Sequence, residues 1–171
     1  MTAEIGFYHL SRSRLDQALG QLLARSLSAG QRAVIRCRDA AQLQSLNAAL
    51  WKLDDSPWLP HGSKAQGQGE RQPIWLTLDH DVPNGARFLF LMAGVESDDA
   101  TAFERAFIVF DGADEIAVSW AREKWWGWAA QDLPLSYWQQ TEDGWKNRPT
   151  RGRKRRSGPS TYETPPPHFV R

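Results

Sequence analysis

The chain has 171 residues, of which 41% are hydrophobic and 24% charged, with a formal net charge of +1. This length and composition suit one globular domain with a single sizeable core. Cys37 is the only cysteine, so an internal disulfide is excluded and nothing indicates an oxidising compartment. The N-terminus lacks a signal-peptide pattern, and no stretch approaches the roughly 20 apolar residues of a membrane span. We therefore expect a soluble cytoplasmic protein.

The net charge hides an asymmetry along the chain. Residues 1–143 contain 13 Lys or Arg and 19 Asp or Glu, a balance of −6. Residues 144–171 contain 8 basic residues and 1 acidic residue, a balance of +7. The mildly acidic body argues against a large duplex-DNA surface, because duplex binding is dominated by phosphate neutralisation.

The first fifty residues alternate between strand and helix patterns. Apolar runs at 5–10 and 32–37 predict strands, and leucines at helical spacing predict helices at 14–30 and 40–53. Asp39 is placed to cap the second helix. Strand, helix, strand, helix in this order predicts right-handed crossovers and a mostly parallel central sheet flanked by helices, the α/β class.

The rest of the chain is less regular. Residues 54–71 are rich in Pro, Gly and polar residues, which predicts a long loop. The elements predicted after it are strands at 73–78, 86–94 and 107–112, the first two joined through a turn at 83–85, a short helix at 100–107, a helix at 113–130 and a hairpin at 135–148. We expect one domain at 1–147, and a disordered, basic, proline-rich tail at 148–171.

Three tryptophans stand within four positions of the last predicted helix, in the segment AREKWWGWA. Each helical residue advances about 100° around the axis. If Ile116 faces the core, Trp120 and Trp128 fall on the same stripe, whereas Trp125 and Trp126 fall beside or opposite it. We therefore expect the first pair to pack in the core and the second pair to meet solvent or a partner.

Arg122 stands one turn before that second pair, with Val118 on the same side, and Lys124 falls inside the core stripe and must snorkel. An arginine beside exposed apolar groups suits a ligand that combines an apolar group with an anion. A peptide that ends in a large hydrophobic residue fits, and so does a nucleotide. Helix geometry does not distinguish these two ligands. It also allows Trp126 to lie flat on the surface while Arg122 forms an ion pair with Glu123 or with a distant carboxylate.

A second aromatic patch surrounds the long loop. Trp51 ends a predicted helix, and Trp58 lies seven residues later, followed by Leu59 and Pro60. Rigid aromatic side chains in loops are typical interface anchors. The alternative is that both rings cap the edge of the core.

Motifs for catalysis and metal binding are missing from the sequence. It contains no phosphate-binding loop, no dinucleotide fingerprint and no nucleophile elbow, and its histidines lack zinc-like spacing. Asp79, His80 and Asp81 stand together at a strand end; a small enzyme or metal site there is a third hypothesis, and a solvated turn is the simpler one. Cys37 suits a buried apolar position. We expect no catalytic residue, metal or cofactor.

Eight local patterns occur in order: FYHL, RCRDAAQLQSLNAALW, WLPHG, QPIWLTL, PNGARFLFLMAG, VFDG, AREKWW and the tryptophan of DGWK. Together they resemble the chi subunit of bacterial DNA polymerase III holoenzyme, over about residues 4–146. The resemblance implies a Rossmann-like α/β domain and a non-catalytic replication accessory subunit. It also implies two partners. One is the acidic, Phe-terminated tail of the single-stranded-DNA-binding protein (SSB), and the other is the psi subunit, which links chi to the clamp loader.

The resemblance also assigns residues to these partners. The family's tail site has a helix arginine followed three residues later by an aromatic, which places it at Arg122 and Trp125, with Trp126 alongside. The family lysine one turn earlier is replaced by Val118, for which Lys124 or the basic tail is a candidate to compensate.

The psi-facing aromatics of the family fall on Trp51 and Trp58, with Leu59 and Pro60 beside them. Psi is not found in every bacterium that has chi. The segment after about residue 148 extends beyond the usual end of the family, either as a solvated tail or as a source of nonspecific affinity for DNA or the acidic peptide. The alternative function is direct binding of single-stranded nucleic acid through Trp126 and this tail.

Overall fold

A computed structural model describes residues 3–53 and 58–148. Within these stretches the helices are α1 (Leu15–Ser28), α2 (Ala40–Trp51) and α3 (Glu115–Ala129), with two short 3₁₀ turns, η1 (Gly69–Arg71) and η2 (Ala100–Ala102). The strands are β1 (Glu4–Leu10), β2 (Ala33–Arg36), β3 (His61–Gly62), β4 (Ile74–Thr77), β5 (Phe88–Leu91), β6 (Arg105–Asp111), β7 (Leu135–Thr141) and β8 (Gly144–Arg148). The tail expected at 148–171 lies outside the described residues, apart from Arg148.

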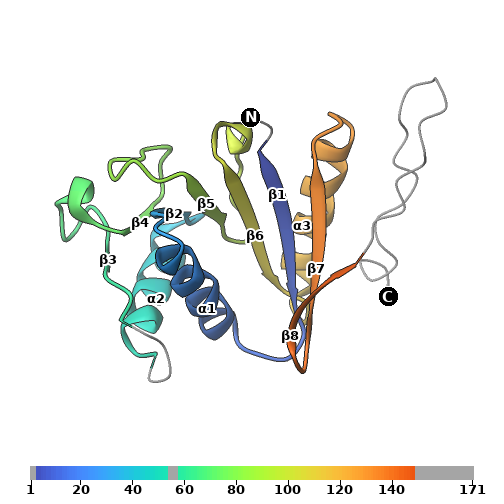
Figure 1. Cartoon of the computed structure of the whole chain (residues 1–171), viewed down its shortest axis with the longest axis horizontal. Helices are drawn as coiled ribbons and strands as arrows, with labels where there is room; N and C mark the ends of the chain where they lie inside the picture. Colours follow the sequence, from blue (N-terminus) through green and yellow to red (C-terminus); the bar gives the residue numbers. More distant parts are fainter. Residues whose placement is uncertain (1–2, 54–57, 149–171) are drawn as a thin grey trace.

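The strands form one sheet in the order β3-β4-β2-β5-β6-β1-β7-β8 (Figure 1). Neighbouring strands are parallel except for β7 and β8, which form the predicted antiparallel hairpin. The predicted α/β class with a mostly parallel sheet is therefore confirmed. Although a turn joins β4 to β5 in sequence, the two strands do not pair with each other, because β2 lies between them and pairs with both.

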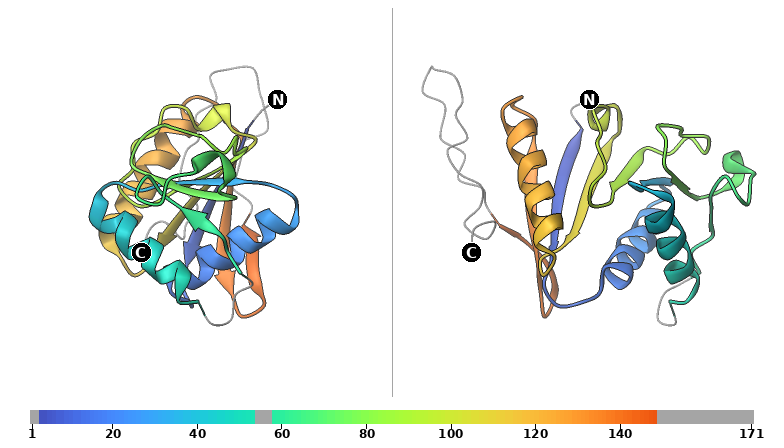
Figure 2. Two further views of the ribbon diagram at one scale, coloured as in Figure 1. Left: turned by 90° about the vertical axis from the view of Figure 1, so that its left-hand side faces the viewer. Right: turned by 180° about the vertical axis from the view of Figure 1, so that it is seen from behind.

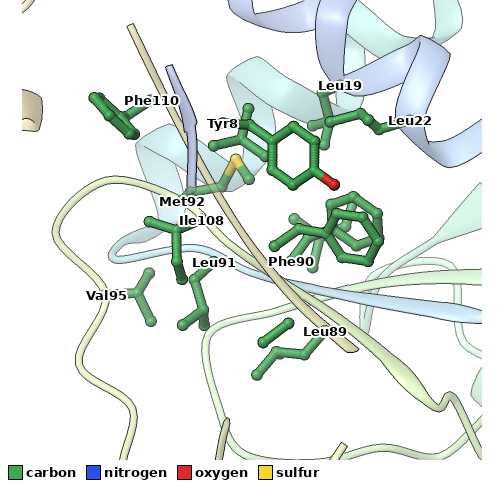
Figure 3. Close-up of a cluster of buried hydrophobic side chains, with 14 of the residues drawn as sticks. Tyr8, Leu19, Leu22, Leu89, Phe90, Leu91, Met92, Val95, Ile108 and Phe110 are labelled. Atoms are coloured by element: carbon green, nitrogen blue, oxygen red, sulfur yellow. The ribbon is translucent and has the colours of Figure 1, made fainter. Parts of the chain in front are cut away.

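Helices cover both faces of the sheet. Side chains alternate along β1, so that Phe7 faces α3 and contacts Trp125, whereas Tyr8 faces α1 and lines a pocket with Leu22. Figure 1 shows α3 behind β1 and β7, and α2 packs beside α1. Figure 3 shows part of the core on the α1 side, where Leu19 and Leu22 lie near Tyr8 and Phe90.

Local sequence determines where α1 ends and where α2 begins. Gly30, just after α1, has a φ of +75°, a left-handed conformation that glycine adopts without strain. The Asp39 carboxylate accepts a hydrogen bond from the backbone N–H of Gln42 at 2.8 Å, which confirms the predicted cap of α2. That hydrogen bond lowers the pKa of Asp39 below its ordinary value.

A buried ion pair joins the end of β2 to the loop that follows β5. Arg36 is 2% exposed, and its guanidinium donates two hydrogen bonds to the Asp99 carboxylate, at 2.5 and 2.9 Å. The same guanidinium lies 5.5 Å from the centroid of the Phe103 ring. The hydrogen bonds from Arg36 hold the pKa of Asp99 at about 2, below its usual value.

We expect Asp99→Asn to lower the free energy of unfolding by about 3 kcal/mol at neutral pH, because Arg36 then stays buried without a counter-charge. The carboxylate pKa is depressed in the folded protein, so its contribution is complete above about pH 4 and is lost as the pH falls toward 2. Urea denaturation measures both effects. Asp98→Asn is the matched control, since Asp98 is exposed; equal stability of the two variants would contradict the assignment.

Candidate functional site

The helix α3 begins at a capping carboxylate, since Asp114 accepts hydrogen bonds from the backbone N–H groups of Ile116 and Ala117. The helix packs against β6 and β7, and the rear view in Figure 2 shows it in front of the sheet. Its buried face mixes small and large side chains: Ala117, Trp120, Ala121, Trp125, Trp128 and Ala129. The prediction that Trp120 and Trp128 pack in the core is confirmed.

Trp125 is also a core residue, and the prediction that it meets solvent or a partner is wrong. Its side chain is 1% exposed and packs edge-on against Phe7, with ring centroids 4.9 Å apart, and against Tyr137 at 6.4 Å. The error comes from the reference residue, because Ile116 is 83% exposed. The buried face is centred near Ala121, so Trp125 falls within about 40° of its middle.

Trp126 stays at the surface, where it is 39% exposed. Arg122 and Val118 are half-buried beside it. The spacing of four residues places Val118, Arg122 and Trp126 in one line along the helix. We call these three residues the α3 row; they place an aliphatic group, a guanidinium and an indole one after another along the helix.

Lys124 lies on the opposite flank of α3. Its side chain is 13% exposed, and its ammonium group forms an ion pair with Glu96. The side chain therefore reaches the surface from a mostly buried position, as the sequence predicts. A residue two positions from Arg122 points about 160° away around the helix. This geometry therefore gives no support to the expectation that Lys124 replaces the family lysine at position 118.

Two cations of β8, Lys146 and Arg148, are not among the residues that the sequence predicts for the site. The ring of Tyr137 in β7 faces α3, since it contacts Trp125. Arg148 is in register with Tyr137, and Lys146 is in register with Gln139. Paired residues of adjacent strands point to the same face, so both cations lie on the face that carries α3. Alternation along the predicted hairpin is the sequence signal that could have found them.

The second aromatic patch is exposed. Trp51 is 53% exposed and Trp58 is 78% exposed, which contradicts the alternative that both rings cap the core. The Trp51 ring packs on the buried His61 ring with centroids 4.1 Å apart. Leu59 is 4% exposed, so the expectation that it contacts a partner is wrong, because the side chain anchors the loop in the core. Pro60 is half-buried.

The Asp79–His80–Asp81 cluster does not converge on one point. Asp79 forms an ion pair with Lys64 at 2.6 Å, and Asp81 accepts hydrogen bonds from side chains of β4. His80 turns the other way, toward Asp99, at 3.6 Å. The enzyme hypothesis needs these three residues in one pocket, and their geometry does not provide it.

The loop that follows β1 forms hydrogen bonds with a side chain of the protein itself, unlike the corresponding loop in many open α/β folds. In such folds the loop after the first strand binds phosphate through backbone N–H groups. Here the backbone N–H groups of Ser11, Arg12 and Ser13 all donate to Oε1 of Gln140, at 3.2, 2.9 and 3.1 Å. A side chain from β7 therefore satisfies the donors that a phosphate would otherwise engage.

Comparison with known proteins adds to this geometry. Residues 1–136 match a family model described as "DNA polymerase III chi subunit, HolC". The chain belongs to this chi-subunit family. A curated relative from Rickettsia prowazekii (strain Madrid E), named "Probable DNA polymerase III subunit chi", is 30% identical over 90 residues. That alignment covers 53% of this chain and 54% of the relative, so the chain spans about half the length of the curated relative it matches.

Membership of the chi family confirms the resemblance drawn from local motifs, and this family is described as a subunit of DNA polymerase III. The family match ends at residue 136, so Lys146 and Arg148 lie beyond the matched residues. Among residues 3–53 and 58–148, the helices are too short or too polar to span a bilayer.

We expect Trp125→Ala to lower the free energy of unfolding by about 4 kcal/mol, because it leaves a large cavity against Phe7 and Tyr137. Trp126→Ala removes a ring at the surface, so its effect is expected to stay below about 1 kcal/mol. Urea denaturation followed by circular dichroism compares the two variants. A similar loss in both would show that the buried face of α3 is assigned incorrectly.

Proposed function

We propose that this chi-family chain is a non-catalytic adaptor of the replication machinery. In this proposal the α3 row holds the acidic C-terminal tail of SSB, and the patch at Trp51 and Trp58 docks on the psi subunit of the clamp loader. The adaptor therefore acts by binding two proteins at once, which raises the local concentration of each for the other.

The arrangement of the α3 row is the observation that carries the proposal. A peptide that ends in phenylalanine presents a ring and a carboxylate within one residue. The guanidinium of Arg122 can form two parallel hydrogen bonds with a carboxylate, and the indole of Trp126, one turn further along the helix, offers an apolar surface to the ring. Because Trp125 packs tightly beneath, the helix is held in place before the ligand arrives.

Lys146 and Arg148 extend this chemistry to the acidic residues of the tail. Both lie on the sheet face that carries α3, and Lys146 is exposed. The body of the chain carries a balance of −6 up to residue 143, so an acidic peptide requires local cations to approach it. These two side chains supply positive charge in place of the family lysine that is replaced by Val118 in this chain.

The patch at Trp51 and Trp58 has the features of a protein-binding anchor. The His61 ring holds Trp51 in one orientation, and the buried Leu59 fixes the loop beside Trp58. Large apolar rings that are exposed and held rigidly contribute much of the binding energy when a partner covers them.

We expect Arg122→Ala to weaken binding of an acidic peptide ending in Phe about 30-fold, the effect of losing roughly 2 kcal/mol at an interface hot spot. Amidating the peptide C-terminus is expected to have a comparable effect on the wild-type protein, since the carboxylate loses its charge. Isothermal titration calorimetry measures both. Unchanged affinity in both measurements would remove Arg122 from the proposed role.

Two control variants sharpen this test. Arg122→Lys keeps the charge but loses the forked donor geometry, so we expect an intermediate affinity. Arg87→Ala removes an exposed arginine that pairs with Glu104 outside the α3 row, and it is expected to leave peptide binding unchanged. A loss of binding in Arg87→Ala would indicate a general charge effect.

We expect Trp58→Ala to weaken association with the psi subunit of the same organism by about 30-fold without loss of stability, since its ring is 78% exposed. Co-purification and size-exclusion chromatography follow the complex. Peptide binding at the α3 row should persist in this variant. Complex formation at wild-type affinity would show that psi docks elsewhere.

A further inference from the structure

The sheet has a second binding surface on the face opposite α3. In the described part of the chain, α1 packs against β2 and β6, and no helix lies over β7 and β8 on this face (Figure 1). A pocket of about 260 Å³ opens between the last turns of α1 and the exposed part of the sheet. It lies apart from the α3 row, because the sheet separates the two.

Aromatic rings form the floor of this pocket. Tyr8 and Trp138 stack with an interplanar angle of 3° and centroids 5.9 Å apart, and Trp145 meets Tyr8 edge-on at 5.2 Å. Phe107 stacks against the other side of Tyr8 at 5.5 Å. Trp138 and Trp145 are half-buried, so part of each indole remains accessible to a ligand. Trp145 stands nearly perpendicular to Tyr8 and Trp138, so a planar ligand ring can stack on one indole and meet the other edge-on.

Two arginines stand at the edge of the same pocket. Arg105 lies 4.8 Å from the Phe107 centroid and 3.6 Å from a Glu4 carboxylate oxygen, so it is engaged within the protein. Arg25, in the last turn of α1, is exposed and has no ion pair with any residue that the structure describes. It supplies a cation beside the aromatic floor.

We propose that this pocket binds single-stranded nucleic acid, with a base stacked on the indole of Trp145 and a backbone phosphate paired with Arg25. Proteins that bind single strands combine aromatic platforms with cations that follow the backbone. The proposed contact differs from the peptide site on α3 in its residues and in its sheet face. It also differs from the alternative considered from the sequence, in which single-stranded nucleic acid binds through Trp126.

The charge near this pocket suits a polyanion, and its aromatic rings favour nucleic acid over an acidic peptide, because each nucleotide combines a planar base with a phosphate. The sequence that follows β8 contains Arg151, Arg153, Lys154, Arg155 and Arg156. A fully extended chain spans about 3.5 Å per residue, so these five cations are tethered within roughly 30 Å of Arg148. Single-stranded nucleic acid carries one phosphate per nucleotide along the path that such a cluster can reach.

The experiment measures binding of a fluorescein-labelled oligothymidylate of about 20 nucleotides to the full chain, by anisotropy at ~50 and ~200 mM salt. We expect Trp145→Ala to weaken binding about 10-fold and Trp145→Phe to restore most of it. Arg25→Gln is expected to weaken binding about 3-fold and to reduce the salt slope by about 0.7, the effect of one lost phosphate contact.

Lys52→Gln is the matched charge control, because Lys52 is exposed at the end of α2, away from the pocket. Arg25→Gln decides the outcome, since this exposed side chain can be changed without disturbing the hairpin. Wild-type affinity for the oligonucleotide in Arg25→Gln would overturn the proposal, as would an equal loss in Lys52→Gln or a loss confined to Trp126→Ala.

An acidic peptide ending in Phe tests the competing class of ligand. We expect Arg25→Gln to bind this peptide as the wild type does, because the peptide uses the α3 row on the other face. If Arg25→Gln instead weakened the peptide and left the oligonucleotide unaffected, the pocket would be a peptide site and the nucleic-acid proposal would fail. Peptide binding at the α3 row is judged separately, by Arg122→Ala.

Discussion

The contact of Trp125 with Phe7 and Tyr137 is the interaction on which the arrangement of both protein faces depends. It fixes α3 against β1 and β7 through edge-on aromatic packing, with ring centroids 4.9 and 6.4 Å apart. Buried alanines at 117, 121 and 129 let the helix approach the sheet closely. The same contact orients Tyr137, and alternation along β7 then turns Trp138 toward the opposite face.

Because side chains alternate along the strands, the proposed binding surfaces lie on different faces of the sheet. One face of the sheet carries α3 with its arginine and exposed indole, together with the cations of β8. The other face carries the aromatic pocket beside α1, and the patch at Trp51 and Trp58 lies at the far end of α2. Three surfaces that do not overlap allow an adaptor to keep one partner while it engages another.

Most of the fold, but less of the site, could be predicted from the sequence. Most strands, the three long helices, the Asp39 cap and the terminal hairpin follow from local patterns and agree with the structure. The short helix predicted at 100–107 is instead a 3₁₀ turn at Ala100–Ala102 followed by the start of β6 at Arg105, and the loop predicted at 54–71 contains β3 and η1. The prediction for Trp125 fails because it sets the exposed Ile116 toward the core, and hydropathy alone does not show which side of a helix a sheet covers. The prediction for Leu59 fails because the burial of a loop residue depends on tertiary packing that local sequence does not encode.

The side-chain oxygen of Gln140 joins two segments that are about 130 residues apart in sequence, since it accepts three backbone hydrogen bonds from the loop between β1 and α1. In many α/β proteins the corresponding donors point at a bound phosphate, whereas here they join this loop to β7. The start of α1 and the strand β7 are therefore tied together, so local unfolding of one is expected to loosen the other.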